Sequence, residues 1–341
     1  APQAAPGWAW AKPAEEVRWV ETPPLAYHQL LRGAPRYRWW KPLLAVVLGL
    51  IYYFTLSVAY TIPFMPALLL SDSVDLTDPS SVTSTLVDTQ NPVGLLLGIG
   101  SVVLILPSVL LAMLSVGLRP TRRLWSVALR IRWRWIGRTV LPGVAALVVM
   151  NGLGILLGPL FPGGDGASPA PSEIDVRAAL WSLLVVLLLV PLQATAEELA
   201  YRGLMTQALG AWLGGVRGDS ALSRFLRGPW PPIAVVSLLF GFSHLYDIWG
   251  WLSVVGMAVM LGWLSWRTGG LEAAITLHVL NNLVAFGLMA SGATGETSQS
   301  SDAGGPASLI AAVAGFALYA WWVDRDFGRR DGVRTRVDLV E

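Results

Sequence analysis

The chain has 341 residues, of which 54% are hydrophobic and 13% are charged, and its mean hydropathy is +0.56. Soluble domains carry about a quarter of charged residues, so this composition excludes an ordinary soluble protein and indicates an integral membrane protein. The sequence contains no cysteine, which excludes a disulfide framework, thiolate metal ligands and a cysteine nucleophile.

Residues 1–41 are rich in proline, tryptophan and basic side chains. We interpret them as an N-terminal cytoplasmic tail that is partly disordered or lies on the lipid surface. His28 falls in this segment. We expect it to be an interfacial polar residue without a functional role.

Apolar runs follow, and several are as long as the ~20 residues that a helix needs to cross a bilayer. They cover residues 43–62, 93–118, 140–160, 178–196, 232–245, 251–266, 273–289 and 308–323. The sequence therefore predicts an all-α fold, a polytopic transmembrane helical bundle with about eight spans.

The charges of the connecting loops predict the orientation of the bundle. Loop 71–92 contains four aspartates and no Lys or Arg, whereas loop 119–138 contains seven arginines. Basic loops stay on the cytoplasmic side of a membrane. The charge alternation and the even number of spans place both termini in the cytoplasm. The bias toward Ala, Gly, Arg and Trp suggests a GC-rich bacterium, so we expect these spans to lie in a bacterial plasma membrane.

The stretch Leu124 to Arg138 alternates arginine with tryptophan. This pattern suits an interfacial helix, or a positive loop, that faces anionic lipid on the inner side. The predicted partner of this segment is the lipid bilayer and not a nucleic acid.

The sequence AEELAYRG, residues 196–203, ends a long apolar run with two adjacent carboxylates. Ionisable groups are costly inside a membrane and usually mark a site. Glu198 and Arg202 are four residues apart and can pair along one helix face, while Glu197 points roughly 100° away. One carboxylate is then neutralised and the other stays free for chemistry. The alternative is a purely structural ion pair at the membrane border.

Two further motifs place polar residues in apolar spans. His244 follows Phe240 by four residues in LLFGFSHL, and Asn282 follows His278 by four residues in TLHVLNNL. Each pair shares a helix face, so three faces can converge on one buried pocket. Glutamate with histidine can take a proton from water, and a second histidine with an asparagine amide can donate hydrogen bonds to a tetrahedral oxyanion. This set of groups indicates hydrolysis of an amide within the membrane.

One conflict affects the boundary of the fourth span. His244 lies ~18 Å along its helix from the cytoplasmic side, whereas Glu197 ends its apolar run near that side. For the two to meet, the helix from Ala178 must continue past Glu197 to Leu213, with Pro191 permitting a kink. We expect this longer helix.

The three motifs, in their order, resemble those of a known family. EELAYR, FGFSH and HVLNN look like the EExxxR, FxxxH and HxxxN motifs of the CPBP family, which includes type 2 CAAX prenyl endopeptidases and bacterial proteins linked to bacteriocin processing and self-immunity. The resemblance implies a catalytic helical core over residues 178–289. Around it we expect transmembrane helices over 42–177, a flexible outer loop over 290–306, and a last span with a basic cytoplasmic tail over 307–341.

The resemblance also implies an activity and residue roles. The chain would be an intramembrane protease acting on a peptide or protein substrate at the membrane, without a cofactor. By matching position, the implied roles are water activation by Glu197 with His244 as its partner, an oxyanion site made by His278 and Asn282, helix register held by Glu198 and Arg202, and a pocket wall made by Phe240.

Three alternatives stay open. A zinc-dependent version of the same protease would use Glu197, His244 and His278 as a three-ligand set. A non-catalytic scaffold or a bacteriocin self-immunity protein of the same fold would keep the helices without the chemistry. A transporter would use Glu197, Glu198 and Arg202 as a relay, and it would be expected to show internal repeats, which we do not find.

Overall fold

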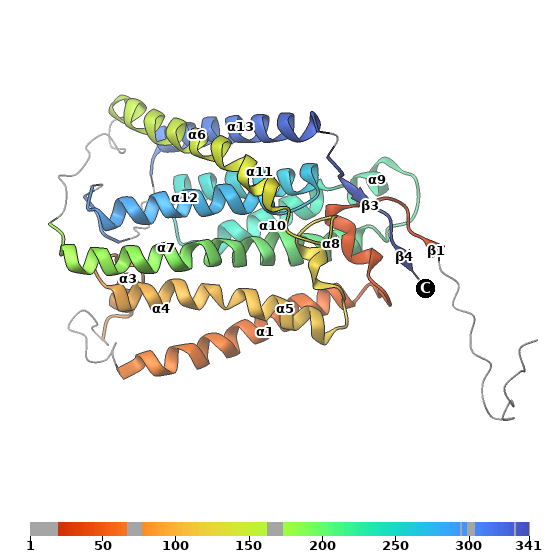
Figure 1. Cartoon of the computed structure of the whole chain (residues 1–341), viewed down its shortest axis with the longest axis horizontal. Coiled ribbons are helices and arrows are strands. Elements are labelled where there is room, and N and C mark those ends of the chain that lie inside the picture. The colour runs from red at the N-terminus through yellow and green to blue at the C-terminus, as the bar shows by residue number, and fades with distance from the viewer. Residues whose placement is uncertain are drawn as a thin grey trace, which may run out of the picture.

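The computed structural model describes residues 20–66, 77–161, 173–293, 295–298, 304–330 and 332–340. Within these ranges the regular structure is almost entirely helical (Figure 1). Seven helices are long and apolar enough to cross a membrane, and an eighth span results if the bent pair Ala221–Arg227 and Trp230–Phe242 counts as one. The predicted all-α bundle of about eight spans is confirmed.

The first half of the chain is taken here as the part before Val176. Its helices are α1 Lys41–Thr61, η2 Ile62–Phe64, α3 Pro79–Val87, α4 Pro92–Val103, α5 Ile105–Ser115, η3 Thr121–Leu124, α6 Trp133–Leu157 and η4 Gly158–Leu160.

The second half contains all three motifs. Its helices are α7 Val176–Glu198, the π-helical turn η5 Leu199–Met205, α8 Thr206–Leu213, α9 Ala221–Arg227, α10 Trp230–Phe242, α11 Ile248–Thr268, α12 Glu272–Ala290 and α13 Pro306–Gly328.

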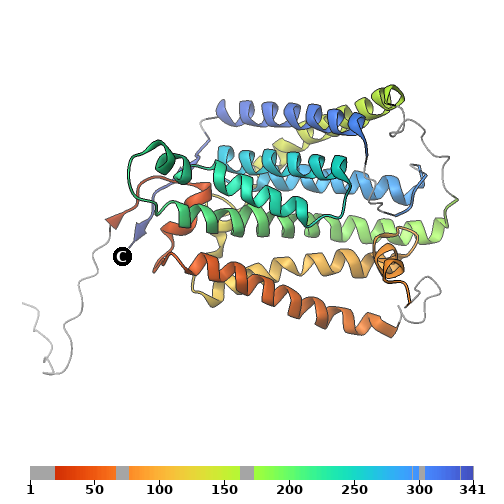
Figure 2. The same ribbon diagram turned by 180° about the vertical axis from the view of Figure 1, so that it is seen from behind.

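The long helices run along one common direction, and α7 and α12 lie in the middle (Figure 1, and Figure 2 from behind). On one side α6 packs against α13, and on the other α1 packs against α5. Helix α7 packs against both α12 and α4, and α10 packs against α11 and η5. The motif-bearing segments therefore adjoin one another, since α7 packs against α12 and α10 packs against η5, the direct continuation of α7.

The predicted extension of the fourth span is confirmed. Helical structure runs from Val176 to Leu213, with Pro191 inside it. The segment that follows Glu198 is not plain α-helix but one π-helical turn, over Leu199–Met205. Such turns insert an extra residue into a helix and are frequent at functional sites.

The N-terminal segment is not the disordered or lipid-surface tail that the composition predicted, as far as it is described. The 3₁₀ helix η1, Tyr27–Gly33, packs against α8, and Leu30 and Leu31 are fully buried. Residues 1–19 lie outside the described part of the chain. The apolar side chains between the basic ones explain the difference, because they fill a site on α8 that composition alone cannot reveal.

His28 is likewise buried rather than interfacial. Its Nε2 atom lies 3.1 Å from the carbonyl oxygen of Arg227. Burial lowers the pKa of His28, and the hydrogen bond to that carbonyl opposes the shift only in part. The ring is therefore a neutral packing group that joins η1 to the end of α9.

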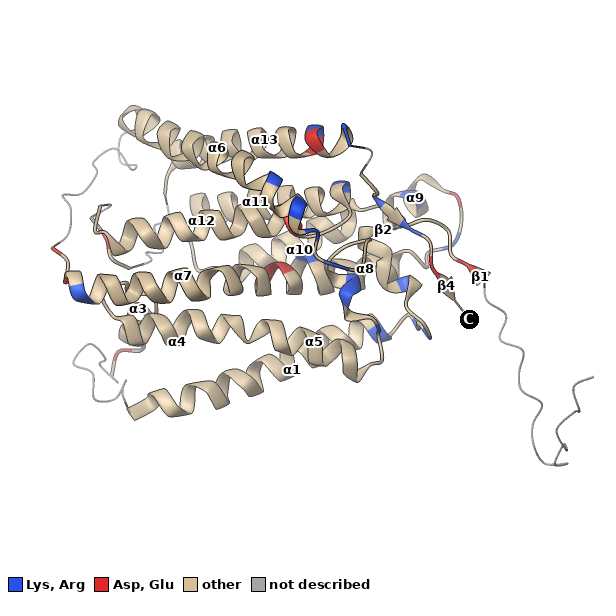
Figure 3. Ribbon diagram, viewed as in Figure 1, with Lys and Arg blue, Asp and Glu red and all other residues tan. Residues whose placement is uncertain are grey.

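Short strands tie the two ends of the described chain together. Strand β1, Val20–Glu21, pairs with β4, Leu339–Val340, and β2, Leu25–Ala26, pairs with β3, Thr335–Arg336. Most lysines and arginines gather at this same end of the bundle (Figure 3). By the distribution of positive charge, this end is predicted to be cytoplasmic.

Of the two forms expected for residues 124–138, the structure has a loop that leads into α6 at Trp133 and no separate interfacial helix. The chain is irregular between η3 and α6, and two arginines turn inward. Arg123 Nη1 lies 2.7 Å from Asp338 Oδ2, and Arg132 Nη2 lies 2.7 Å from Glu272 Oε2. Buried carboxylates on distant segments therefore fix this loop, because each offers a guanidinium a charge-assisted pair.

The expected flexible outer loop over 290–306 falls only partly within the described residues, because 294 and 299–303 lie outside them.

Candidate active site

A buried cluster of charged side chains lies beside α12, where α7 continues into η5. Glu198, Arg202 and His278 are each at most 2% exposed. Glu198 Oε1 accepts a hydrogen bond from His278 Nδ1 at 2.7 Å and lies 3.0 Å from Arg202 Nη1. The predicted pairing of Glu198 with Arg202 is therefore present, and the same carboxylate also holds a histidine from 80 residues further along the chain.

Glu197 stands on the other side of the same imidazole. Its Oε2 atom lies 3.3 Å from His278 Nε2, and its side chain keeps 13% exposure. Within the described residues Oε2 has no aligned hydrogen-bond partner. Glu198 is paired with Arg202 and accepts from Nδ1, so Nε2 is the ring nitrogen of His278 that faces Glu197, and a proton can pass between Nε2 and this carboxylate.

Phe240 packs over this cluster from α10. Its ring centroid lies 4.2 Å from the guanidinium carbon of Arg202 and 5.9 Å from the His278 ring, which it meets edge to face. The ring of Tyr201 meets the Phe240 ring edge to face, with the two centroids 4.9 Å apart. The ring face of Phe240 stabilises the buried cation and covers the cluster on one side.

His244 lies just beyond the end of α10, next to Phe240. Their rings are 4.7 Å apart, and His244 Nδ1 lies 2.8 Å from the carbonyl oxygen of Phe240. A carbonyl oxygen only accepts, so the hydrogen-bond network assigns the proton of the neutral ring to Nδ1 and leaves Nε2 as an acceptor. The His244 ring also stacks on Tyr246, with the two ring centroids 5.7 Å apart.

Asn282 is one helical turn after His278 on α12. Its Nδ2 atom donates to Gln193 Oε1 at 3.2 Å, and its Oδ1 accepts from Asn281 Nδ2 at 3.2 Å. The amide is thus held in one orientation, and its second N–H has no partner among the described residues. Gln193 is a site residue that the sequence analysis missed. Its position four residues before Glu197, as a polar residue in an apolar run, was the available signal.

The arrangement differs from the predicted set of pairs. The structure places His278, not His244, against Glu197, and it turns both nitrogens of His278 toward carboxylates. No hydrogen bond or ion pair joins His244 to Glu197 in the described part of the chain. Residue spacing defines the faces of each helix but not the depth at which neighbouring helices meet, so the pairing of the histidines required the packed structure.

The zinc-dependent alternative requires Glu197, His244 and His278 as three ligands of one metal ion. Over the described ranges, no group of three or more His, Asp and Glu side chains is arranged to hold a metal ion. In this arrangement Glu197, His244 and His278 do not form such a group.

Comparison with known proteins bears on the same segment. Residues 179–284 match the family model described as type II CAAX prenyl endopeptidase Rce1-like. The uncharacterized protein YyaK of Bacillus subtilis (strain 168) is 23% identical over 185 residues, which are 52% of this chain and 55% of YyaK. The match thus spans about half the length of that relative. No solved structure matches the chain. The segment of this integral membrane protein that holds Glu197, His244, His278 and Asn282 is similar to the Rce1-like type II CAAX prenyl endopeptidases, and the family resemblance predicted from the three motifs is confirmed.

Proposed function

We propose that this chain is an intramembrane endopeptidase that hydrolyses a peptide bond at the site formed by α7, η5, α10 and α12. The observation that carries the proposal is the position of Glu197, whose partly exposed carboxylate lies 3.3 Å from the imidazole of His278. The match of residues 179–284 to an endopeptidase family supports the same reaction class.

In the proposed mechanism Glu197 is the general base. Its carboxylate takes a proton from water as the water oxygen attacks the carbonyl carbon of the scissile bond. Nε2 of His278 can accept that proton from Glu197 and pass it to the nitrogen of the scissile bond, so that the C–N bond breaks and the amine leaves, because Nδ1 is fixed on Glu198. Arg202 holds the carboxylate of Glu198 in place, and the hydrogen bond from His278 Nδ1 to that carboxylate keeps the imidazole turned toward Glu197.

His244 and Asn282 take the remaining roles. The free Nε2 of His244 can accept a hydrogen bond from the same water, as the motif resemblance implies for the partner of Glu197. The unpaired N–H of Asn282 can donate to the oxyanion that forms on the scissile carbonyl. His278 is not part of the proposed oxyanion site, because both of its ring nitrogens face carboxylates.

The substrate is proposed to be a peptide or protein segment that enters from the lipid or from the cytoplasmic side. Leu213 ends the long helix 16 residues after Glu197, so the site lies roughly 24 Å from the basic end of the bundle. We keep the predicted location in a bacterial plasma membrane, and we expect neither a cofactor nor a nucleic acid to take part.

The experiment is cleavage of a quenched fluorescent peptide library by purified protein in detergent. Wild type is compared with Glu197→Gln and His244→Ala, and with Glu173→Gln as a control at an exposed carboxylate outside the site. Each sample is measured with and without a zinc chelator, and its metal content is determined.

The outcomes separate the candidates. Cleavage that survives chelation and is lost in Glu197→Gln and His244→Ala but kept in Glu173→Gln supports the glutamate mechanism. Loss on chelation that added zinc restores supports the zinc-dependent alternative. Lack of cleavage by folded wild type supports the scaffold or self-immunity alternative, in which Glu197→Ala leaves the biological effect intact.

A further inference from the structure

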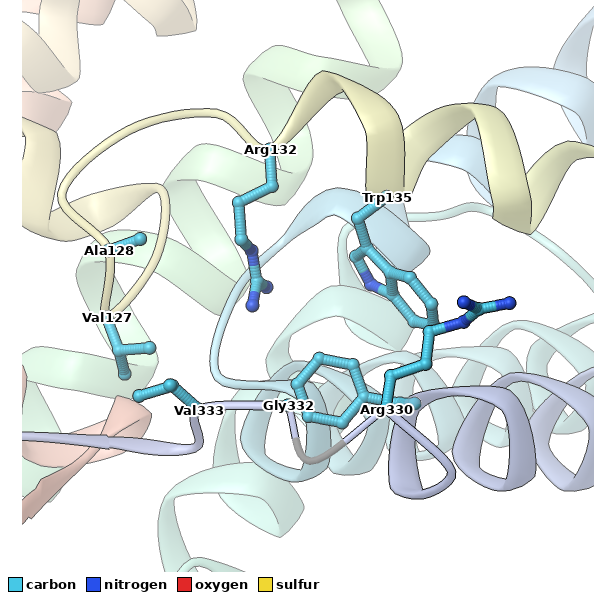
Figure 4. A pocket seen from close by; sticks show the side chains of 8 residues that line it. Val127, Ala128, Arg132, Trp135, Arg330, Gly332 and Val333 are labelled. Carbon is cyan, nitrogen blue, oxygen red and sulfur yellow. The ribbon is translucent and has the colours of Figure 1, made fainter.

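A basic pocket lies where the start of α6 meets the end of α13. It encloses about 380 Å³ and is lined by Arg132, Arg134, Trp135, Arg138 and Arg330. An adjoining cavity of about 250 Å³ shares Arg132, Trp135 and Arg330 and adds apolar side chains such as Val127 and Val333 (Figure 4). We call the first of these the arginine pocket. It is separate from the candidate active site and shares no residue with it.

Two of the four arginines are already neutralised. Arg132 is paired with Glu272 at 2.7 Å, and Arg330 is paired with Asp326 at 3.1 Å. Arg134 and Arg138 have no ion-pair partner among the described residues. They stand four residues apart on one face of α6, so two uncompensated positive charges line the same pocket.

Trp135 adds a neutral donor to this wall. Its Nε1–H is buried and has no acceptor among the described residues, and the ring meets Phe327 edge to face at 5.1 Å. In Figure 4 the indole nitrogen lies on the side of the ring toward Arg132. A buried N–H without an acceptor is costly, so an oxygen-rich anion in this pocket would stabilise it.

The face of α6 that carries the two free arginines continues as an apolar stripe. Leu141, Val148 and Ile155 follow at helical spacing and are 64%, 66% and 79% exposed. Helix α6 is one of the candidate membrane spans. A ligand bound by the arginines would thus have lipid-exposed surface directly below it. A free anion makes no use of this stripe, whereas a lipid contacts the arginines with its phosphate and the stripe with its acyl chains.

We propose that the arginine pocket binds the phosphate of an anionic phospholipid. Arg134 and Arg138 supply the charge, Trp135 supplies a directed N–H, and Leu141, Val148 and Ile155 contact an acyl chain. Basic pockets between helices at the cytoplasmic border of a membrane are suited to such headgroups. The lipid is expected to hold α6 against α13 at the predicted cytoplasmic end. This proposal is independent of the proteolytic function, and its failure would leave that function untouched.

The test measures lipid binding by purified full-length protein in a neutral detergent. Dioleoylphosphatidylglycerol is titrated in, and the bound lipid is counted by native mass spectrometry. Dioleoylphosphatidylcholine and inorganic phosphate serve as the zwitterionic and free-anion arms. The variant is Arg134→Gln with Arg138→Gln, and the matched control is Arg119→Gln with Arg122→Gln, which removes two exposed arginines at the same end of the bundle.

Wild type and the control are expected to bind phosphatidylglycerol in preference to phosphatidylcholine. The Arg134/Arg138 variant is expected to bind it about tenfold to thirtyfold more weakly. Trp135→Phe, which keeps the packing against Phe327, is expected to weaken binding by a few fold, and it tests the site if the double variant does not fold.

Three results would overturn the proposal. The first is that the Arg134/Arg138 variant and the Trp135→Phe variant each bind phosphatidylglycerol as tightly as wild type does. The second is an equal loss in the Arg119/Arg122 control, which would indicate general surface charge. The third is equal affinity for inorganic phosphate in competition, which would indicate a free-anion site.

Discussion

Glu198 Oε1 lies 2.7 Å from His278 Nδ1 and 3.0 Å from Arg202 Nη1, so one buried carboxylate fixes both a cation on its own helix and an imidazole on another. The second nitrogen of that imidazole faces Glu197. The two adjacent glutamates therefore have different surroundings. Glu198 is enclosed by its partners, whereas Glu197 remains open on one side.

This difference predicts that the two glutamates respond differently to the same substitution. Glu198→Gln leaves Arg202 buried without its counter-charge, and breaking a buried ion pair costs about 3 to 5 kcal/mol. We expect a loss of this size in the free energy of unfolding, measured by denaturant titration in detergent. Glu197→Gln is expected to change it by less than about 1 kcal/mol. Equal destabilisation by both variants would contradict the division of roles.

Gln193 is predicted to be a positioning residue for Asn282. Gln193→Leu removes the acceptor at 3.2 Å from Asn282 Nδ2. The amide then loses its fixed orientation, and kcat is expected to fall about tenfold with KM little changed. In an Asn282→Ala background the same substitution should add almost nothing. A full additional loss in that background would show that Gln193 acts independently of Asn282.

Asp338 is predicted to make the stability of the contact between residues 20–34 and residues 332–340 depend on pH. Burial alone would raise the pKa of its carboxyl group, but hydrogen bonds and charge from Arg123 and Arg336 outweigh burial and hold the pKa below its usual value. The stabilisation is therefore fully present above the unfolded pKa of about 3.9 and is lost as the pH falls through the lower folded value.

We expect the melting temperature of wild type to exceed that of Asp338→Asn at pH 7, with the difference shrinking only below about pH 4. Melting curves of both proteins between pH 7 and pH 3 check this. A difference that already disappears between pH 6 and pH 5 would rule out Asp338 as the group responsible.

Gly210 is predicted to be essential for the docking of η1 on α8. A Cβ atom at this position would lie 2.1 Å from the backbone carbonyl oxygen of His28, so Gly210→Ala must push η1 away. Gly137 on α6 is the control, because a Cβ atom there meets nothing within 4 Å.

Gly210→Ala is expected to destabilise the fold by about 1 to 3 kcal/mol, in the range of overpacked sites. Gly137→Ala is expected to be neutral or to stabilise the fold by up to about 1 kcal/mol. Limited proteolysis of residues 20–34, together with melting temperatures, checks both. Unchanged protection of this segment in Gly210→Ala would show that it does not depend on the contact.

The sequence predicted the helical bundle, the long fourth span and the convergence of the motif helices, because hydropathy and residue spacing report directly on spans and helix faces. It did not predict η1 or the path of residues 124–132. Their positions depend on single long-range partners, such as Asp338 for Arg123 and Glu272 for Arg132. The place of His278 between two carboxylates was missed for a related reason, since it depends on the relative depth of α7 and α12.

The most direct test of the proposed mechanism is the rate at which Glu197→Gln cleaves a peptide that wild type accepts. The change keeps the size of the side chain and removes only its ability to accept a proton. The account predicts that kcat falls by about 10² to 10⁴ while the melting temperature stays near that of wild type. A Glu197→Gln protein that cleaves at the wild-type rate would contradict it.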